Sequence, residues 1–162
     1  MSHAHPQEGW VKKYLWSTDH KIIGLQYLFT GMGMALLGGF CVYAYRMQLG
    51  FPGQSVPGYG LVSPNEYNAL VTNHGTIMIF WVAMPVLIAA FGNFLIPLMI
   101  GCDDMVFPRL NRLSYQIFLV SALVLLASFF VPGGAFGGAW TAYPPLSSKR
   151  QYSLTPGGST LW

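Results

Sequence analysis

The sequence predicts an all-α integral membrane protein, and two observations carry this prediction. Of the 162 residues, 53% are hydrophobic and only 8% are charged, whereas a soluble domain has about 25% charged residues. Three stretches, residues 22–45, 67–102 and 113–148, contain no Asp, Glu, Lys or Arg. Each is longer than the about 20 apolar residues that a membrane-spanning helix requires. Because the runs are continuous, they lack the alternation of a membrane β-barrel. The net charge of +3, without a basic cluster, argues against a nucleic-acid partner.

The first expected span covers about residues 22–45. Four glycines within it are expected to let neighbouring helices approach closely. They are Gly31, Gly33, Gly38 and Gly39. A connector over residues 47–66 follows, because its prolines and glycines interrupt helices.

The second expected span covers about residues 70–96. As one straight helix, the apolar stretch 70–100 would reach roughly 46 Å, which exceeds a hydrocarbon core of about 30 Å. We therefore expect this helix to tilt, protrude or kink, with Pro85 and Pro97 as the kink points. A short polar turn leads to the third expected span, which covers about residues 114–131.

The distribution of Lys and Arg predicts the orientation in the membrane. Five of these residues lie on the side of the N-terminus, and three lie on the other side. The five are Lys12, Lys13, Lys21, Arg109 and Arg112, and the three are Arg46, Lys149 and Arg150. Since positive charge favours the cytoplasmic side, we expect a cytoplasmic N-terminus.

Polar groups at or within the apolar runs are the candidate functional residues, because such groups are costly in a bilayer. His74 suits three roles: a ligand to haem iron or another metal, a hydrogen bond to a neighbouring helix, or a proton relay. Arg46 either extends to the membrane interface or donates to a buried cofactor. Asn93 either bonds a neighbouring helix or lines a water-filled path. Asp104, in the polar turn, is either a solvated turn residue or a proton collector at a channel mouth.

Six segments resemble subunit I of the haem-copper oxidases, in family order and with close to family spacing. They are Trp16–Gly24, Thr72–Pro85, Gly92–Asn93, Pro97–Gly101, Asp104–Asn111 and Trp140–Leu146. The likeness covers nearly the whole chain from Trp16 to Leu146. It is closest to the N-terminal part of an aa3-type cytochrome c oxidase subunit I.

The resemblance implies a low-spin haem a site at four positions. His74 matches one of the two axial ligands of the haem iron, and Arg46 matches the arginine that hydrogen-bonds the haem formyl group. Tyr67 matches a tyrosine near the same haem. Trp140 matches a tryptophan close to the haem propionates.

The resemblance also implies the entrance of a proton path, the D channel. Asp104 matches the acid at the cytoplasmic mouth of this channel, and His20 matches a histidine near that mouth. Asn93 and Asn111 match the asparagines that hold water in the lower part of the channel. The family orientation, with the N-terminus inside, agrees with the charge count.

Several positions depart from the family pattern. Arg112 replaces the second of two paired asparagines and adds a cation about two turns from Asp104. Gln48 replaces a glutamate that contributes to a calcium or sodium site in many members. Leu37 and Cys41 stand where quinol-oxidising members carry Arg and Asp, which favours cytochrome c as the electron donor.

Subunit I of this family has about a dozen spans, so the sequence predicts a partial subunit I domain over residues 1–162. Haem a3, copper B and the second haem a ligand are then expected in the missing part of the subunit. The resemblance implies cytochrome c, O2, subunits II and III and the bilayer as partners, in a bacterial inner membrane. Two alternatives stay open: a quinol-oxidising member of the same superfamily, and a non-catalytic three-span membrane protein in which His74 is structural.

Overall fold

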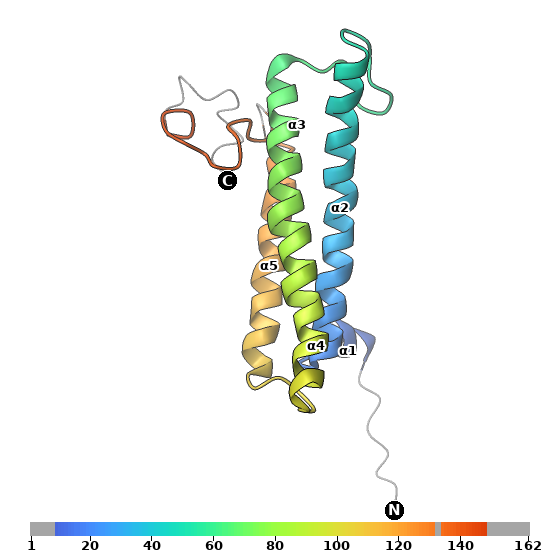
Figure 1. Cartoon of the computed structure of the whole chain (residues 1–162), viewed down its shortest axis with the longest axis vertical. Coiled ribbons are helices and arrows are strands. Elements are labelled where there is room, and N and C mark those ends of the chain that lie inside the picture. Colours follow the sequence, from blue (N-terminus) through green and yellow to red (C-terminus); the bar gives the residue numbers. More distant parts are fainter. Residues whose placement is uncertain (1–8, 132–133, 149–162) are drawn as a thin grey trace, which may run out of the picture.

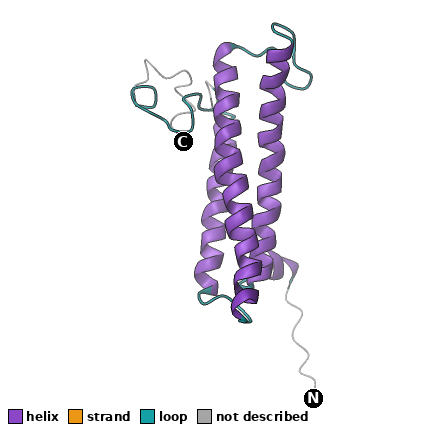
Figure 2. Cartoon of the chain, in the orientation of Figure 1, coloured by secondary structure: helices purple, strands orange, loops and turns teal. Residues whose placement is uncertain are grey.

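Three long helical rods form the molecule, and a shorter helix lies at one end (Figure 1). The computed structural model describes residues 9–131 and 134–148. The elements in chain order are α1 (Trp10–Tyr14), α2 (His20–Gly50), α3 (Pro64–Thr76), η1 (Ile77–Ala83), η2 (Pro85–Ala90), α4 (Phe91–Ile100) and α5 (Pro108–Ser128). Within the described ranges no strand forms, and the rest is loop (Figure 2).

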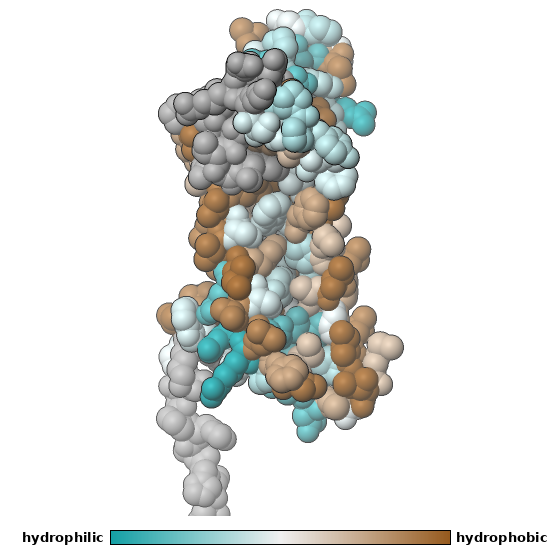
Figure 3. Space-filling view, turned by 90° about the vertical axis from the view of Figure 1, so that its left-hand side faces the viewer, coloured by the Kyte–Doolittle hydropathy of each residue, from teal (hydrophilic) through white to brown (hydrophobic). Residues whose placement is uncertain are grey.

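Three helical stretches are long and apolar enough to cross a membrane, which confirms the predicted fold class. They are His20–Gly50, Pro64–Ile100 and Pro108–Ser128. On the face shown in Figure 3, hydrophobic side chains cover much of the length of the rods. The described helices therefore present to the bilayer the apolar surface that the composition indicated.

The first two rods begin before the predicted spans because polar residues cap them. The Asp19 carboxylate accepts a hydrogen bond from the backbone N–H of Lys21 at 2.8 Å, and α2 starts at the next residue after Asp19. Ser63 and Glu66 form a reciprocal capping box at the start of α3, with Pro64 in the first turn. The caps satisfy free N–H groups outside the apolar runs, so each helix extends beyond its hydrocarbon-spanning part.

The second rod changes its helical type in the middle. Residues 77–83 and 85–90 are π-helical, with hydrogen bonds that reach five residues back, as in the bond from the Met84 N–H to the Ile79 carbonyl. Pro85, one predicted kink point, begins the second π-helical segment, where its missing N–H already interrupts the α-helical ladder. Pro97, the other, lies buried inside α4.

A seam of glycines joins α2 to the second rod at every seventh residue. A Cβ atom at Gly24 would meet the Phe94 ring at 2.8 Å, and one at Gly31 would meet Val86 at 2.7 Å. At Gly38 it would meet the Met78 sulfur at 2.9 Å. The absent side chains are thus what permits close approach of the two rods.

The prediction for the glycines of the first span is therefore half confirmed. Gly31 and Gly38 lie in the seam, but a Cβ at Gly33 or Gly39 would meet nothing within 4 Å. These two glycines point away from the second rod, because residues two or one positions from a seam residue lie on another face of the helix. Gly24, just inside the first span, is the seam member that the prediction missed.

Three buried clusters lie along the rods. One, at the end where α2 meets α3, centres on Cys41, Ala44 and Leu70. The middle one contains Met34, Ile77, Ala122 and Leu125, and the third, near the start of α2, contains Ile23, Tyr27, Ala90 and Tyr115. The two ends of the bundle carry the candidate functional residues. We call them the His74 end and the Asp104 end.

Candidate functional site

At the His74 end, one contact between helices fixes the orientation of the imidazole. The Nδ1 atom of His74 lies 2.9 Å from the backbone carbonyl oxygen of Gly38 on α2. A carbonyl only accepts hydrogen bonds, so Nδ1 carries the proton and Nε2 of the neutral ring keeps its lone pair. This is the arrangement in which histidines ligate metals, with the second ring nitrogen held by a carbonyl. The residue is half-buried rather than enclosed.

Tyr45 connects His74 to Tyr67 through ring contacts. Its ring centroid lies 5.8 Å from that of His74 and 5.9 Å from that of Tyr67, both in edge-to-face geometry. The structure therefore brings two of the predicted residues, His74 and Tyr67, to one aromatic group. Tyr45 had no sequence signal beyond its place beside Arg46 near the end of the first span.

Arg46 lies on the exposed side of α2, eight residues after Gly38 and thus about 12 Å further along the helix axis. Within residues 9–131 and 134–148, no hydrogen bond or ion pair engages its guanidinium group. The structure does not bring Arg46 into contact with His74.

The loop after α5 is held against α3 by the two residues that precede His74. The Thr72 hydroxyl accepts a hydrogen bond from the Ala139 N–H at 3.0 Å, and the Asn73 side-chain amide donates to the Phe136 carbonyl at 3.3 Å. Next along the loop, the Trp140 ring lies 5.9 Å from the Phe80 ring on η1. These contacts bring Trp140 to the same rod as His74, with the indole about half exposed.

At the Asp104 end, the buried imidazole of His20 meets the carboxylate of Asp104. The distance from His20 Nδ1 to Asp104 Oδ1 is 2.9 Å, and the same oxygen accepts from the Met105 N–H at 2.7 Å. The Asp104 side chain is half exposed, whereas His20 is 4% exposed. The carboxylate thus faces solvent on one side and the bundle on the other.

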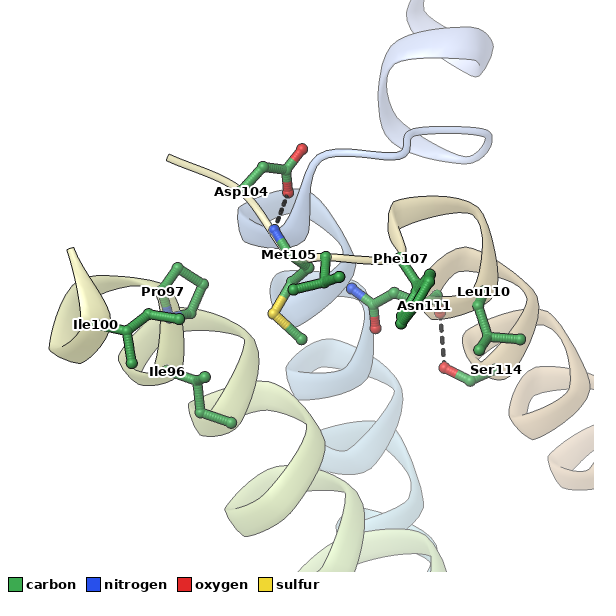
Figure 4. A pocket seen from close by; sticks show the side chains of 10 residues that line it. Ile96, Pro97, Ile100, Asp104, Met105, Phe107, Leu110, Asn111 and Ser114 are labelled. Atoms are coloured by element: carbon green, nitrogen blue, oxygen red, sulfur yellow. Dashed lines mark hydrogen bonds between the residues drawn. The ribbon is translucent and has the colours of Figure 1, made fainter. Parts of the chain in front are cut away.

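The two predicted asparagines are directly bonded to each other. The Asn111 side-chain amide donates to Asn93 Oδ1 at 2.5 Å, and Asn93 in turn donates to the Ala89 carbonyl at 2.6 Å. A cavity of about 340 Å³ lies beside this pair, between α4, α5 and the turn that joins them. Asp104 and Asn111 both line this cavity (Figure 4). All four residues predicted for this path therefore gather at one end of the bundle.

The sequence of the chain matches the family described as cytochrome c and quinol oxidase polypeptide I over residues 22–162. This chain belongs to that family. It is 43% identical to the alternative cytochrome c oxidase subunit 1 of Bradyrhizobium diazoefficiens, over 94% of this chain and 24% of that protein. It is 46% identical to the cytochrome c oxidase subunit 1 of Mytilus edulis, over 90% of this chain and 26% of that protein.

More distant organisms give a similar likeness. The haem-copper oxidase subunit I+III of Aeropyrum pernix is 43% identical over 91% of this chain and 17% of its own length. The chain thus spans about a quarter or less of the length of these relatives. It corresponds to part of a haem-copper oxidase subunit I, from a family of integral membrane proteins that use haem and copper.

The residues at the His74 end fit a haem of this oxidase family. The imidazole has its Nδ1 proton on a helix carbonyl and its Nε2 lone pair available, and a Cβ atom at the neighbouring Gly75 would meet nothing within 4 Å. Only one histidine stands here. Within the described ranges, no three His, Cys, Asp or Glu side chains gather to hold a metal ion. One axial ligand to a macrocycle matches this arrangement better than a multidentate protein site.

Two hydroxyl groups, those of Ser114 and Tyr27, continue the hydrogen bonds of the asparagine pair further into the bundle. Ser114 Oγ donates to the Asn111 carbonyl at 2.6 Å and lies 3.0 Å from the Tyr27 hydroxyl. Neither residue was predicted from the sequence. A signal was present, since Ser114 follows Asn111 by three residues and hence lies on the same helix face.

Arg112, the departure from the family pattern near Asp104, bonds elsewhere. Its Nη1 atom lies 3.4 Å from the backbone carbonyl oxygen of Trp16. In the part of the chain that the structure describes, it forms no ion pair with Asp104. The guanidinium group thus fastens the segment before α2 to α5.

Gln48, the other departure, carries a buried Oε1 atom without a hydrogen-bond partner in the described residues. Together with Ser63 and Tyr67 it lines a cavity of about 440 Å³ between the end of α2 and the start of α3. A neutral amide oxygen there supplies one uncharged acceptor where many family members have a carboxylate.

Proposed function

We propose that the chain is the N-terminal part, over residues 1–162, of the catalytic subunit of a terminal oxidase. In this function the complete enzyme oxidises cytochrome c, reduces O2 to water and pumps protons. Haem a3, copper B and the second axial ligand of haem a belong to the remainder of the subunit, and subunits II and III complete the assembly. The bilayer is that of a bacterial inner membrane, with the N-terminus on the cytoplasmic side, as the Lys and Arg distribution favours.

The single observation that carries this proposal is the hydrogen bond between His74 Nδ1 and the Gly38 carbonyl at 2.9 Å. It supports His74 as an axial ligand to the iron of a low-spin haem a through Nε2. Bound there, the haem supplies one-electron redox chemistry. The Gly38 carbonyl keeps the imidazole in one tautomer and one orientation, and so raises its basicity as a ligand.

Three further residues shape this haem site in the proposal. Arg46 donates a hydrogen bond to the haem formyl group, which its unengaged guanidinium supports. Tyr67 lies beside the haem and is braced by Tyr45. Trp140 lies near the propionates and is braced by Phe80. A donor such as Arg46 near the cofactor tunes its potential through the outer coordination sphere.

Replacement of His74 by Ala in the complete enzyme tests the ligand assignment. We expect loss of the low-spin haem a absorption band, because the iron loses one of two axial nitrogens. A matched control is Val71→Ala, at an exposed position of the same helix, which leaves the imidazole. Retention of the low-spin band in His74→Ala would show that another residue holds the iron.

The Asp104 end is proposed as the mouth of the D path for protons. Asp104, half exposed, collects protons from the cytoplasm beside His20, and the bonded pair of Asn93 and Asn111 orders water without adding charge. The Asp104→Asn variant of the complete enzyme should take up protons more slowly at unchanged haem content. Asp103→Asn, at the neighbouring exposed position, is the matched control, and an equal slowing in both would contradict the assignment.

Cytochrome c rather than a quinol is the proposed electron donor. Leu37 and Cys41 line a cavity of about 660 Å³ between α2, α3 and the loop after α5. The residues of α2 that line this cavity are uncharged, and Glu66 of α3, which also lines it, accepts a hydrogen bond from the Ser63 N–H. Steady-state oxidation of reduced cytochrome c against that of a ubiquinol analogue by the complete enzyme tests the choice, and faster quinol oxidation would reverse it.

A further inference from the structure

Residues 10–16, which precede the first span, present an exposed apolar and aromatic surface. Trp10 is 68% exposed, Val11 60% and Trp16 60%, and Tyr14 and Leu15 are also exposed. Five large apolar or aromatic side chains within seven residues form a patch that water solvates poorly. Such a patch indicates that a second surface covers these side chains and removes them from water.

This segment is held beside the bundle at its Asp104 end. The Gln26 side-chain amide donates to the Tyr14 carbonyl, and Gln26 lies six residues inside α2, about 9 Å from its first residue. On the other side, Arg112 of α5 bonds the Trp16 carbonyl at 3.4 Å. α1 therefore folds back against the rods instead of extending from them (Figure 1).

The two bonds set the depth of the segment relative to the membrane. Both partners, Gln26 and Arg112, lie in the first turns of helices that are long and apolar enough to span it. The first residues of such helices lie at the boundary between hydrocarbon and water. Residues 10–16 thus lie at the level of the lipid head groups, where Trp and Tyr side chains are most favourable.

The charge of the segment suits an anionic surface. Lys12 and Lys13 lie within α1, and residues 9–18 contain no Asp or Glu. Two carboxylates at this end of the bundle are engaged by protein groups, Asp19 by the Lys21 N–H and Asp104 by His20, while Asp103 is exposed. Each lysine close to a membrane surface contributes to the attraction of anionic lipids.

We propose that residues 10–16 form a lipid-binding surface that lies in the head-group layer of the bilayer and prefers anionic phospholipid because of the two positive charges that the sequence places at residues 12 and 13. The aromatic rings insert at the interface, and the two lysines select for the charge of the head group. This surface is distinct from the residues of the haem site and of the proton path.

Spin labelling of the intact membrane protein tests the depth. In a Cys41→Ser, Cys102→Ser background, Trp10→Cys and, separately, Val11→Cys carry a nitroxide label in nanodiscs of phosphatidylcholine and phosphatidylglycerol. We expect both O2 and an aqueous nickel chelate to relax the nitroxide, with the ratio of the two effects that is typical of a label at the membrane interface. Relaxation dominated by the nickel chelate at both positions would place the segment in water. Weak relaxation by both agents would show that protein covers it. Either result would overturn the proposal.

The lipid preference is tested by removing the two charges. The double variant Lys12→Gln, Lys13→Gln should lose preference for phosphatidylglycerol over phosphatidylcholine by roughly fivefold per lysine, measured as co-purified lipid by native mass spectrometry. Its matched control, Lys21→Gln with Arg109→Gln, removes the same charge from the same end of the bundle outside the segment. An unchanged preference in the first variant, or an equal loss in both, would contradict a specific role for residues 10–16.

Discussion

His20 and Asp104 lie 84 residues apart in the chain, yet their side chains meet at 2.9 Å. The contact joins the first residue of α2 to the turn between α4 and α5. Because His20 is buried and Asp104 is half exposed, the imidazole anchors a carboxylate whose other face stays in contact with solvent. The contact thereby fixes the position of the Asp104 carboxylate, the proposed proton collector, while leaving it accessible.

Removal of this imidazole should loosen the Asp104 end. We expect His20→Ala to lower the free energy of unfolding by about 1 kcal/mol, less than the roughly 1.5–3 kcal/mol of a hydrogen bond to a charged group, because Asp104 is partly screened by water. Thermal denaturation in detergent measures the change. Lys21→Ala, at the next and exposed position, is the control, and an equal loss there would assign the effect to the helix terminus alone.

The loss of stability on a Gly→Ala substitution in the glycine seam should depend on the space that the structure leaves for a Cβ atom at that position. Gly24→Ala meets an aromatic ring and the Ala90 carbonyl, and Gly31→Ala meets the stiff side chain of Val86, so each should cost about 1–3 kcal/mol. Gly38→Ala meets the flexible end of Met78 and should cost less. Gly33→Ala, with nothing within 4 Å, is the neutral control. Thermal stability of the four variants checks the order, which an equal effect at Gly24 and Gly33 would refute.

The backbone at Ala139 should favour glycine. Its φ angle is 64°, in the left-handed region that costs a residue with a Cβ atom roughly 1–2 kcal/mol. Ala139→Gly is therefore expected to raise the thermal denaturation temperature. Ala122→Gly, inside α5, should lower it, since there glycine has the poorer helix propensity. A lower stability of Ala139→Gly would show that the positive φ angle does not strain the backbone at Ala139.

The loop that carries Trp140 should loosen when Thr72 loses its hydroxyl. In Thr72→Val the Ala139 N–H loses its acceptor, which costs about 1 kcal/mol. We expect faster limited proteolysis within residues 134–148, read by mass spectrometry. The matched control is Thr76→Val, because the Thr76 hydroxyl donates only within its own helix, to the Thr72 carbonyl. Equal cleavage rates in the two variants would show that Thr72 does not hold the loop.

Alkaline pH should weaken the connector between α2 and α3 through Tyr59. Burial raises the pKa of the Tyr59 phenol above its ordinary value, and the nearby charges of Glu66 and Cys41 raise it further. A raised folded pKa means that the stabilisation is complete below the ordinary tyrosine pKa and is lost as the pH rises through the folded value. Tyr59→Phe should remove this alkaline loss. The measurement is cleavage of the connector against pH, and an unchanged profile in Tyr59→Phe would reject the role of the phenol.

Apolar runs and their boundaries were sufficient to predict the three rods, because the bilayer dictates helix length. They did not predict which face of each rod contacts its neighbour. Gly33 and Gly39 look like Gly31 and Gly38 in the sequence, and only the position of the neighbouring rod separates them. The π-helical segments were also beyond reach, since Pro85 predicts an interruption but not the hydrogen-bond pattern that absorbs it.

The candidate site was predictable to a similar extent. His74 and Asn93 are conspicuous because a polar group within an apolar run is costly in lipid. Tyr45, Tyr27 and Ser114 are ordinary residues in a sequence, and their importance arises only from what the packing places next to them. Family likeness supplied roles for single positions, whereas the bonds between positions required coordinates.

The π-helical middle of the second rod changes the directions in which the side chains on either side of it point around the rod axis. A helix with hydrogen bonds that reach five residues back takes more residues for each turn than an α-helix. Side chains beyond it are therefore rotated about the rod axis relative to their direction in an uninterrupted α-helix. His74 before this stretch bonds α2, and Asn93 after it bonds Asn111 on α5. The π-helical turns thus set the angle about the rod axis between His74 and Asn93. In a rod made purely of α-helix, one of these two side chains would point away from its partner.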